Sequence, residues 1–253
     1  MTAPGVVRLA SWNLRSGLSL DRRSLWWTRR RRVAEVLHDV DADLWCFQEV
    51  FGFQRRWLLR HGLAAAPWGH AGEGRNRWRR GEAVPVMWRE RGVRPLSATT
   101  LWMGREPARP GTVAPGASSP RVATAVDLDL AGVGPARVVN THLDTGPAEV
   151  RHRAAEQLAA WAAARDDDLP LVIAGDLNAT LDDAELAPLL AAGLRSVLPD
   201  DAGPTATAFE TEVGRRLDHV LVSHHWEVVS AEVAHRAGTA SDHYPVVAEL
   251  RLR

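Results

Sequence analysis

Acids, amides and histidines gather in six short patches of the sequence, each beside an apolar run of strand length. Their oxygen atoms are the ligands that Mg²⁺ and Mn²⁺ prefer, and two of their histidines supply groups for proton transfer or hydrogen bonding. A divalent-metal phosphoester hydrolase needs this combination where strand ends converge. The patches are residues 11–13, 48–49, 140–144, 175–178, 217–219 and 241–243.

Two patches support this chemistry individually. Glu49 follows an apolar run expected to be a buried strand, where an unpaired carboxylate is costly and requires a cation or water. Asp176 and Asn178, separated by one apolar residue, point the same way if the backbone stays extended, and Gly175 permits a ligand to approach closely. Glu49 alone is also compatible with a solvated acid or a helix cap, and residues 175–178 with a turn before a helix.

His142 and His243 stand beside predicted strands, and Asp218 stands at the start of another. A carboxylate that orients a histidine fixes its tautomer and raises its basicity, so Asp218 is a candidate partner for a catalytic imidazole. His219 and His235 have no comparable setting and are expected to be surface or packing residues. The sequence lacks the Cys or multi-His spacing of a structural zinc site, so we expect Mg²⁺ or Mn²⁺ as the cofactor.

Charge is divided unevenly along the chain although the net charge is zero. All 31 basic residues are Arg, as genomic base composition would explain; residues 1–94 hold 18 Arg against 9 acids, and residues 95–253 hold 13 Arg against 22 acids. The basic half either meets phosphates, which the planar guanidinium group binds well, or is a solvated face. The single cysteine, Cys46, lies in an apolar run and is expected to be buried and inert.

The sequence contains no run of about 18 apolar residues, so no membrane span is predicted. Residues 1–7 lack the basic and apolar regions of a secretory signal. These observations favour a cytoplasmic location, and we expect a monomer.

Apolar spacing predicts strands that alternate with helices and then cluster, which favours a mixed sheet system. The clearest helix follows Pro147, with Val150, Ala154, Leu158 and Trp161 at helical spacing. Segments 67–81 and 104–120 are expected to be loops rather than linkers, because motif residues lie on both sides, so residues 1–253 are predicted to form one domain. Strands are expected at 6–12, 44–47, 83–88, 94–101, 122–130, 137–140, 171–174, 217–222, 226–233 and 246–252, and helices at 22–40, 51–61, 147–165 and 185–192.

Taken in order, the six patches resemble the endonuclease/exonuclease/phosphatase superfamily, whose members include pancreatic deoxyribonuclease, sphingomyelinases and inositol polyphosphate phosphatases. The resemblance runs from Ser11 to about Val247, and six ordered motifs make it specific although each alone is weak. It implies an α/β fold, a four-layer sandwich in which two mixed β-sheets pack face to face with helices outside. The site is then expected at one edge of the sheets.

The resemblance also implies a metal site. Asn13 and Glu49 match the first metal-binding pair of the family, and Asp242 matches the acid that joins them. Asp176 and Asn178 match the Asp-x-Asn pair that holds the nucleophile side and the phosphate.

A catalytic set follows from the same resemblance. His243 matches the catalytic histidine, Asp218 the acid that orients it, and His142 the histidine that hydrogen-bonds the phosphate. The implied reaction is in-line attack of water on phosphorus. Either His243 or Asp176 acts as the base, and His243 could instead serve as a charged partner.

Departures from the family pattern narrow the subfamily. Apurinic-site endonucleases usually carry Tyr at the positions of His142 and His219, which argues against a dedicated base-excision enzyme. The sequence at 141–143 is more similar to that of deoxyribonucleases, sphingomyelinases and deadenylases. Glu82 matches the acid that pairs with this histidine in deoxyribonuclease-like members, or it is a solvated acid at the start of a strand.

Three functions remain open. A nuclease on DNA or RNA is favoured, because Arg77, Arg79 and Arg80 surround Trp78 in a loop between site motifs, and arginines with an aromatic suit a phosphate polymer. The alternative is a phosphatase or phosphodiesterase acting on an inositol phosphate, a phospholipid or another small phosphoester. A non-catalytic binding module on the same scaffold is the remote alternative. Further arginines that support the nuclease are Arg22, Arg23, Arg29, Arg30, Arg31, Arg32, Arg55, Arg56 and Arg75.

Overall fold

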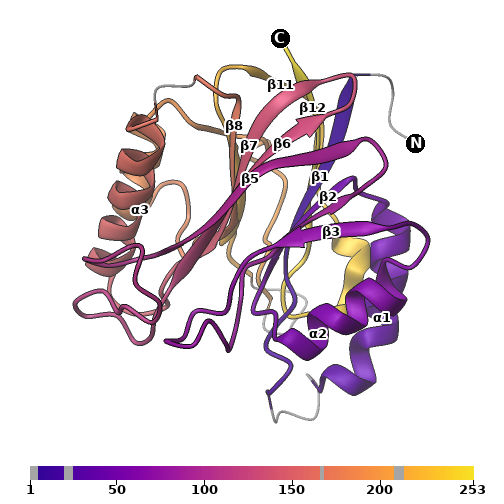
Figure 1. The fold of residues 1–253 in the computed structure, drawn as a ribbon, viewed down its shortest axis with the longest axis horizontal. Helices are drawn as coiled ribbons and strands as arrows, with labels where there is room; N and C mark the ends of the chain where they lie inside the picture. Colours follow the sequence, from indigo (N-terminus) through magenta and orange to yellow (C-terminus); the bar gives the residue numbers. More distant parts are fainter. Residues whose placement is uncertain (1–4, 20–24, 166–167, 208–213) are drawn as a thin grey trace.

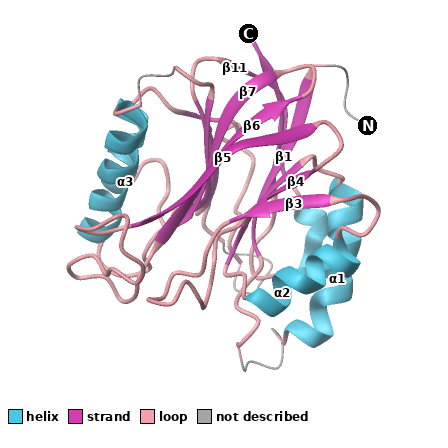
Figure 2. Ribbon diagram, in the orientation of Figure 1, coloured by secondary structure: helices cyan, strands magenta, loops and turns pink. Residues whose placement is uncertain are grey.

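The computed structural model describes residues 5–19, 25–165, 168–207 and 214–253. Two six-stranded β-sheets pack face to face, and helices cover their outer surfaces (Figure 1). The expected four-layer α/β sandwich is therefore confirmed. Figure 2 shows two helices, α1 (Trp26–Val40) and α2 (Gly52–Trp57), on one side of the sheets and α3 (Ala148–Ala163) on the other.

The first sheet joins the two ends of the chain. Its central strand β1 is parallel to β2 and antiparallel to β12, which makes the sheet mixed. In spatial order the strands are β11 (Trp226–Val233), β12 (Val246–Leu252), β1 (Val6–Asn13), β2 (Leu44–Gln48), β4 (Val86–Arg89) and β3 (Trp68–Ala71).

The second sheet comes from the middle of the chain and is also mixed. β7 and β8 are parallel, whereas β8 and β10 are antiparallel. In spatial order the strands are β5 (Val93–Trp102), β6 (Val122–Leu130), β7 (Gly134–His142), β8 (Leu171–Asp176), β10 (Asp218–Val222) and β9 (Arg195–Ser196).

Three apolar clusters hold the four layers together. The central cluster lies between the sheets and includes Leu9, Val126 and Val246. A second cluster joins α1 and α2 to the first sheet through buried rings such as Trp12 and Trp45, and a third joins α3 to the second sheet. Full burial of one large aliphatic side chain stabilises a fold by about 1.5–3 kcal/mol, so these clusters fix where the strand ends lie.

Short helical segments complete the outer layers. A π-helix (Leu58–Gly62) follows α2, where one long helix was expected at 51–61. A 3₁₀-helix (Ala184–Leu186) and α4 (Ala187–Ala191) replace the helix expected at 185–192, and Pro188 lies in the first turn of α4. A further 3₁₀-helix (His235–Ala240) packs against α1.

The prediction of a loop at 67–81 is wrong in part, because β3 (Trp68–Ala71) lies within it. Gly69 of β3 makes room for the Trp88 ring, since a Cβ at Gly69 would lie 2.3 Å from that ring. The strand expected from residue 83 begins at Val86, and β9 was not expected. The helix expected from residue 22 is α1, which begins at Trp26; residues 22–24 lie outside the described residues.

Several strands extend further than expected, toward the polar patches. β1 includes Asn13, β7 includes His142 and β8 includes Asp176. Cys46 is fully buried as predicted, and its burial raises the pKa of the thiol. Within the described ranges, no helix is both long enough and apolar enough to cross a membrane.

Candidate active site

Three neighbouring strands of the second sheet carry His142, Asp176 and Asp218 to the same end of that sheet. Parallel β7 and β8 pair His142 with Asp176, and antiparallel β10 pairs Asp218 with Asp176. Side chains directly opposite each other on adjacent strands point to the same face. The register therefore places these three side chains side by side, and all three are buried.

Gly175 permits the close approach of β7 and β8 just before Asp176. Its φ of 149° lies where side chains are rarely tolerated, and a Cβ there would lie 1.9 Å from the Thr141 carbonyl oxygen. Only glycine combines this backbone conformation with this approach. The sequence suggested that Gly175 permits a ligand to approach closely, and the structure shows that Gly175 also permits the close packing of two strands.

His243 reaches the same place from the segment that precedes β12. Its Nδ1 lies 2.7 Å from Asp218 Oδ2, and its Nε2 lies 3.8 Å from Asp176 Oδ2. Burial alone would lower the pKa of His243, but the negative charges of Asp218 and Asp176 outweigh it and raise this pKa to about 10. The imidazole is therefore positively charged at neutral pH.

Asp176 lies between the two histidines. Its Oδ2 is 3.6 Å from His142 Nε2 and accepts a hydrogen bond of 2.9 Å from the Asn13 side chain. Burial, together with the negative charge of Asp218, raises the pKa of Asp176 to about 7. Burial and the nearby positive charge of Arg121 lower the pKa of His142 well below its ordinary value, so His142 is neutral.

Asn13 links the two sheets at this site. Its side-chain nitrogen donates to Glu49 Oε1 at 3.0 Å as well as to Asp176. The other Glu49 oxygen accepts a 2.6 Å hydrogen bond from the Ser16 backbone N–H. Glu49 has a φ of 60°, which turns the chain sharply after β2 and directs this carboxylate toward Asn13.

Asp242 joins this half of the site through its neighbour. The Ser241 hydroxyl donates to the Asn13 carbonyl oxygen at 2.7 Å and lies 3.2 Å from Asp242 Oδ1. The second oxygen of Asp242 pairs with Arg15. The Trp12 indole N–H donates to the His243 carbonyl oxygen at 2.9 Å and fixes the same segment.

Asn178 lies at the edge of the group. Its backbone N–H donates to Asp176 Oδ1 at 3.0 Å, and its side-chain nitrogen donates to the Leu143 carbonyl oxygen at 3.0 Å. With a φ of 50°, Asn178 sits in a left-handed turn instead of continuing the strand. Its amide keeps a second N–H for another partner.

The donor set fits a divalent cation. One amide, that of Asn13, donates to both Glu49 and Asp176, and Ser241, the neighbour of Asp242, donates to the Asn13 carbonyl oxygen, so hydrogen bonds through Asn13 link the predicted ligands. Ligand atoms of Asp176, Asp218 and His243 lie within 4.8 Å of one another. Hard oxygen donors around a partly buried centre suit Mg²⁺ or Mn²⁺.

The four residues predicted to bind substrate are not in contact with this group. Arg79 pairs with Glu73 and lies 5.7 Å from the centre of the Trp102 ring. Arg77 lies 5.1 Å from the ring of Trp78, which is 75% exposed. These residues form a separate surface on the turn that follows β3.

A groove lies beside that surface, and two of its lining residues directly follow Glu49 in the chain. It has a volume of about 320 Å³ and runs between the start of α2 and the turn. Arg79 and Arg80 line one side, and Val50 and Phe51, which directly follow Glu49 in the chain, line the other.

Glu82 lies at the site without contacting a histidine. Its carboxylate pairs with Arg75 at 2.5 Å, and it lines a small pocket together with Glu49 and His142. Burial raises the pKa of Glu82, and the charge of Arg75 offsets part of that rise.

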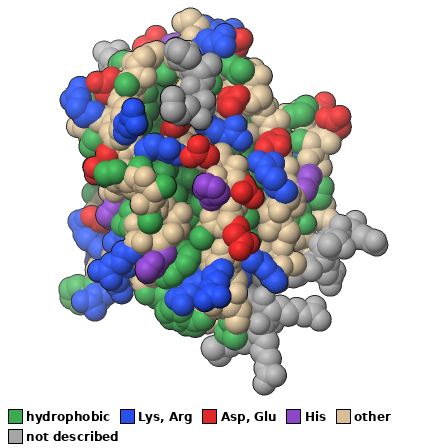
Figure 3. Space-filling view, turned by 90° about the vertical axis from the view of Figure 1, so that its right-hand side faces the viewer, with side chains coloured by type: hydrophobic (Ala, Val, Ile, Leu, Met, Phe, Trp, Pro, Cys, Tyr) green, Lys and Arg blue, Asp and Glu red, His purple; other side chains and the backbone are tan. Residues whose placement is uncertain are grey.

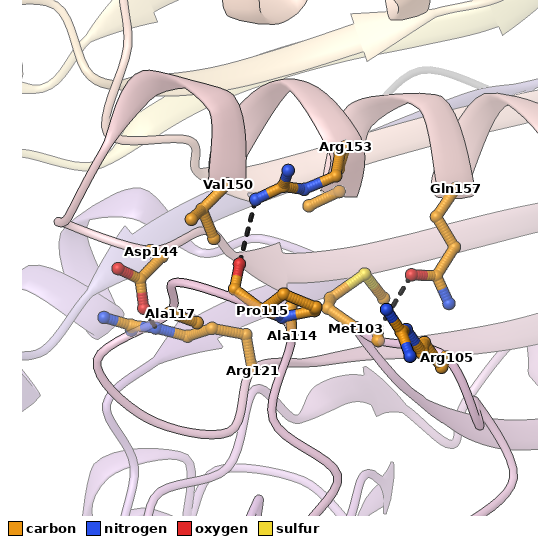
Figure 4. Close-up of a pocket in the computed structure, with 12 residues that line it drawn as sticks. Met103, Arg105, Ala114, Pro115, Ala117, Arg121, Asp144, Val150, Arg153 and Gln157 are labelled. Atoms are coloured by element: carbon orange, nitrogen blue, oxygen red, sulfur yellow. Dashed lines mark hydrogen bonds and ion pairs between the residues drawn. The ribbon is translucent and has the colours of Figure 1, made fainter.

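Arg121 lies between two pockets. It lines the small pocket beside His142 and also a cavity of about 360 Å³ between α3 and the segment that precedes β6. Its Nε donates to Asp144 Oδ2 at 3.2 Å, and Figure 4 shows this pair at one end of the cavity, with Arg105 and Gln157 at the other. The cavity therefore extends from the site along α3.

Two of these residues were not identified from the sequence. Arg15 stands two positions after Asn13, and Arg121 stands directly before β6, so neither position distinguishes it from the other arginines. Arg15 pairs with Asp242, and Arg121 pairs with Asp144. In each pair the two residues are more than 20 positions apart in the sequence, so only the fold brings them together. His219 was expected to be a surface or packing residue, and it is fully buried, with Nε2 2.9 Å from the Ala179 carbonyl oxygen.

Comparisons with known proteins agree with this fold. A crystal structure of an endonuclease/exonuclease/phosphatase from Bacteroides vulgatus matches with a TM-score of 0.89 and 26% identity over 98% of this chain and 99% of that one. A mannosyl-6-phosphatase from Bacteroides thetaiotaomicron matches with a TM-score of 0.83 and 23% identity over 96% and 99% of the two chains.

A more distant structure is that of ANGEL2, a 2′,3′-cyclic phosphatase in complex with adenosine-2′,3′-vanadate. It matches with a TM-score of 0.76 and 16% identity, covering 98% of this chain and 96% of that one. No curated protein matches the sequence significantly. The sequence model of the endonuclease/exonuclease/phosphatase family matches residues 10–243. The chain therefore belongs to the endonuclease/exonuclease/phosphatase family, whose members are phosphoester hydrolases.

Proposed function

We propose that this protein is a divalent-metal-dependent nuclease that hydrolyses phosphodiester bonds by in-line attack of water. The observation that carries the proposal is that His142 and His243 approach one oxygen of Asp176, at 3.6 and 3.8 Å. That oxygen also accepts from Asn13 at 2.9 Å. One small volume thus brings together a carboxylate near its pKa, a neutral imidazole and a charged one.

The residues that would hold Mg²⁺ or Mn²⁺ are Asn13, Glu49 and Asp242, with Asp176 and Asn178 toward the nucleophile. When bound, the cation neutralises charge that develops on phosphoryl and leaving oxygens. Asp242 pairs with Arg15 in the structure. A cation that took the place of Arg15 would keep this carboxylate paired with a positive charge.

Asp176 is the better candidate for the base. Burial and the charge of Asp218 raise the pKa of Asp176 toward the operating pH of a general base, whereas the charges of Asp218 and Asp176 raise the pKa of His243 and keep it protonated. Asp176 would accept the proton of the attacking water. His243, held by Asp218, would face the phosphoryl oxygens as a positive charge.

His142 and Asn178 would donate hydrogen bonds to the phosphate as its negative charge grows. Donors that are already in place stabilise a transition state without further reorganisation. His142 is neutral and carries one N–H. Asn178 has one side-chain N–H left after its bond to Leu143.

Nucleic acid is the proposed substrate because of the arginine-lined groove. Arg79 and Arg80 face Val50 and Phe51 across it, next to Glu49, and Arg77 with the exposed Trp78 extends the same surface. Guanidinium groups that neutralise phosphates supply most of the non-specific affinity for a nucleic acid. Aromatic rings add stacking contacts with bases.

A second candidate is a phosphatase for a small phosphomonoester. It is supported by the structural similarity to the mannosyl-6-phosphatase and by the cavity of about 360 Å³ next to Arg121, which is large enough for a small leaving group. At 23% identity the similarity itself concerns the fold.

One activity panel separates the candidates. The wild type and His243→Ala are incubated with plasmid DNA, single-stranded DNA, RNA, mannose 6-phosphate and p-nitrophenyl phosphate, with Mg²⁺ or with EDTA. We expect cleavage of a polymer that EDTA and His243→Ala both abolish. Phosphate release from the monoesters, with every polymer intact, would support the second candidate instead. No turnover with Mg²⁺, nor with Mn²⁺ in its place, would leave a binding module.

A further inference from the structure

Three aromatic rings form a continuous row on the outer layer beside the site. Trp27 of α1 stacks on Phe53 of α2, with ring centroids 6.0 Å apart and planes 22° apart. Phe53 stacks on Phe51 with the same spacing and angle. Phe51 is separated from Glu49 by one residue, so the row begins next to the site and ends at a ring that is 62% exposed.

Arginines accompany this row. The guanidinium carbon of Arg30 lies 4.8 Å from the centre of the Trp27 ring and 5.8 Å from that of Trp57. In the part of the chain that the structure describes, no carboxylate pairs with Arg30. Figure 3, drawn from the side that carries α1 and α2, shows arginine side chains beside exposed hydrophobic ones on the lower part of this face. This surface therefore combines aromatic rings with positive charge.

The row is fixed relative to the site by Gln54, which is buried. Its side-chain oxygen accepts from the backbone N–H groups of Phe51 at 3.0 Å and Gly17 at 3.2 Å. Its side-chain nitrogen donates to the Arg15 carbonyl oxygen at 3.2 Å. A Cβ at Gly17 would lie 2.5 Å from the Phe53 ring, so this loop packs directly on the row. Rings held in this way lose little freedom when a ligand stacks on them.

We propose that Trp27, Phe53 and Phe51, with Arg30, form a platform on which unpaired bases of single-stranded nucleic acid stack on their way to the site. The proposal rests on the proposed nuclease function and names its substrate class. Unpaired bases have free faces, whereas the bases of a duplex are stacked on each other and cannot reach the rings. Each stacked base contributes about 1–3 kcal/mol by alanine substitution.

Continuity with the groove supports a strand as the occupant. Phe51 belongs both to the row and to the groove that Arg79 and Arg80 line. A chain with a phosphate at every residue can bind Arg30 and the groove arginines while its bases contact the rings between them. A lipid surface carries phosphates but no bases that could contact the rings between them, and a second copy of this chain carries neither.

Binding is measured without cleavage, by fluorescence anisotropy of a labelled single-stranded thymidine 12-mer in EDTA. Trp27→Ala is expected to weaken binding at least about 5-fold, which is the lower limit of the affinity lost when one stacking contact is removed. Trp27→Phe keeps a stacking ring and should retain most of the affinity. Leu96→Ala removes another exposed apolar side chain, 46% exposed on β5 of the other sheet, and should leave affinity unchanged.

Equal affinities of the wild type and Trp27→Ala for the oligonucleotide would overturn the proposal. So would a Trp27→Ala variant that loses as much affinity for the duplex form of this oligonucleotide as for the single strand. If the protein binds anionic vesicles instead of the oligonucleotide and Trp27→Ala abolishes that binding, the row contacts a membrane. If the protein is a dimer that Trp27→Ala dissociates, the row contacts a second copy of this chain.

Hydrolysis of bis(p-nitrophenyl) phosphate, which cannot span the row, separates this proposal from the nuclease function. We expect Trp27→Ala to hydrolyse it at the wild-type rate. A wild type that hydrolyses neither this diester nor DNA nor RNA rejects the nuclease function itself. A wild type that cleaves single strands with a KM unaffected by Trp27→Ala rejects only the platform.

Discussion

The two sheets contribute different halves of the site. The first sheet places Glu49 and Asp242 at half-buried positions, where a backbone N–H and Arg15 hold their oxygens. The second sheet places Asp176 and Asp218 in full burial, against two imidazoles. In the second half, burial and the charge of Asp218 raise the pKa of Asp176, and the charges of Asp218 and Asp176 raise the pKa of His243.

This difference assigns separate tasks to the two halves. Carboxylates near solvent suit a divalent cation, and buried groups with shifted pKa values, here Asp176 and His243, suit proton transfer. Asn13 is the connection, because its one amide donates to Glu49 in one half and to Asp176 in the other. Variants in the two halves should therefore change different kinetic quantities.

The largest expected effect is that of Asp218→Asn, in the buried half. Loss of this charge lowers the pKa of His243, whose value of about 10 depends on Asp218. We expect kcat to fall by about 10²–10³-fold, the usual loss when one group that stabilises transition-state charge is removed, with the required Mg²⁺ concentration unchanged.

The pH profile of Asp218→Asn tests the role of His243. If the charged imidazole is needed, activity is lost as pH rises through the pKa of His243, so this loss should move from near pH 10 toward lower pH in the variant. A gain of activity with rising pH over that interval would identify His243 as the base.

A large effect on stability is expected from Gly175→Ala, which tests whether the buried half depends on the approach of β7 and β8. The new Cβ would meet the Thr141 carbonyl oxygen, and such overpacking costs about 3 kcal/mol. Gly193→Ala is the matched control, because Gly193 also has a positive φ of 82° but no atom within 4 Å of the added Cβ. The free energy of unfolding is measured in urea. Equal losses of this free energy in both variants would show that backbone conformation alone causes the effect.

Glu49→Gln, in the half nearer to solvent, should act through the metal. We expect the Mg²⁺ concentration for half-maximal activity to rise at least about 10-fold, as for other changes at metal sites, with kcat largely restored at saturating Mg²⁺. A fall in kcat that extra Mg²⁺ does not relieve would erase the distinction between the two halves.

The smallest effect is expected on the arginine surface. Replacing Arg77, Arg79 and Arg80 by Ala should weaken DNA binding and reduce the salt dependence of the binding constant, because each lost phosphate contact removes about one unit from the slope. Arg79 already pairs with Glu73, so we expect a smaller reduction than three full contacts would give. An unchanged slope would show that these residues do not meet phosphates.

Much of the fold and the grouping of the site residues could be predicted from the sequence, because both follow from apolar runs that end in polar residues. Asn13, Asp176 and His142 each close such a run, and sheet pairing then brings them together. β3 could not be predicted, because it is short and depends on pairing with β4. The aromatic row was also missed, because Trp27 and Phe53 meet only when α1 and α2 pack on one sheet.

The most direct test of a shared metal-dependent site is cleavage of a labelled single-stranded oligonucleotide by the wild type and by Asp176→Asn, measured with EDTA and again after Mg²⁺ is returned. We expect the wild type to be inactive in EDTA and to regain activity when Mg²⁺ is returned. Asp176→Asn is expected to be inactive under both conditions although circular dichroism shows that it is folded. Cleavage that persists in EDTA, or an Asp176→Asn variant as active as the wild type, would contradict the site described above.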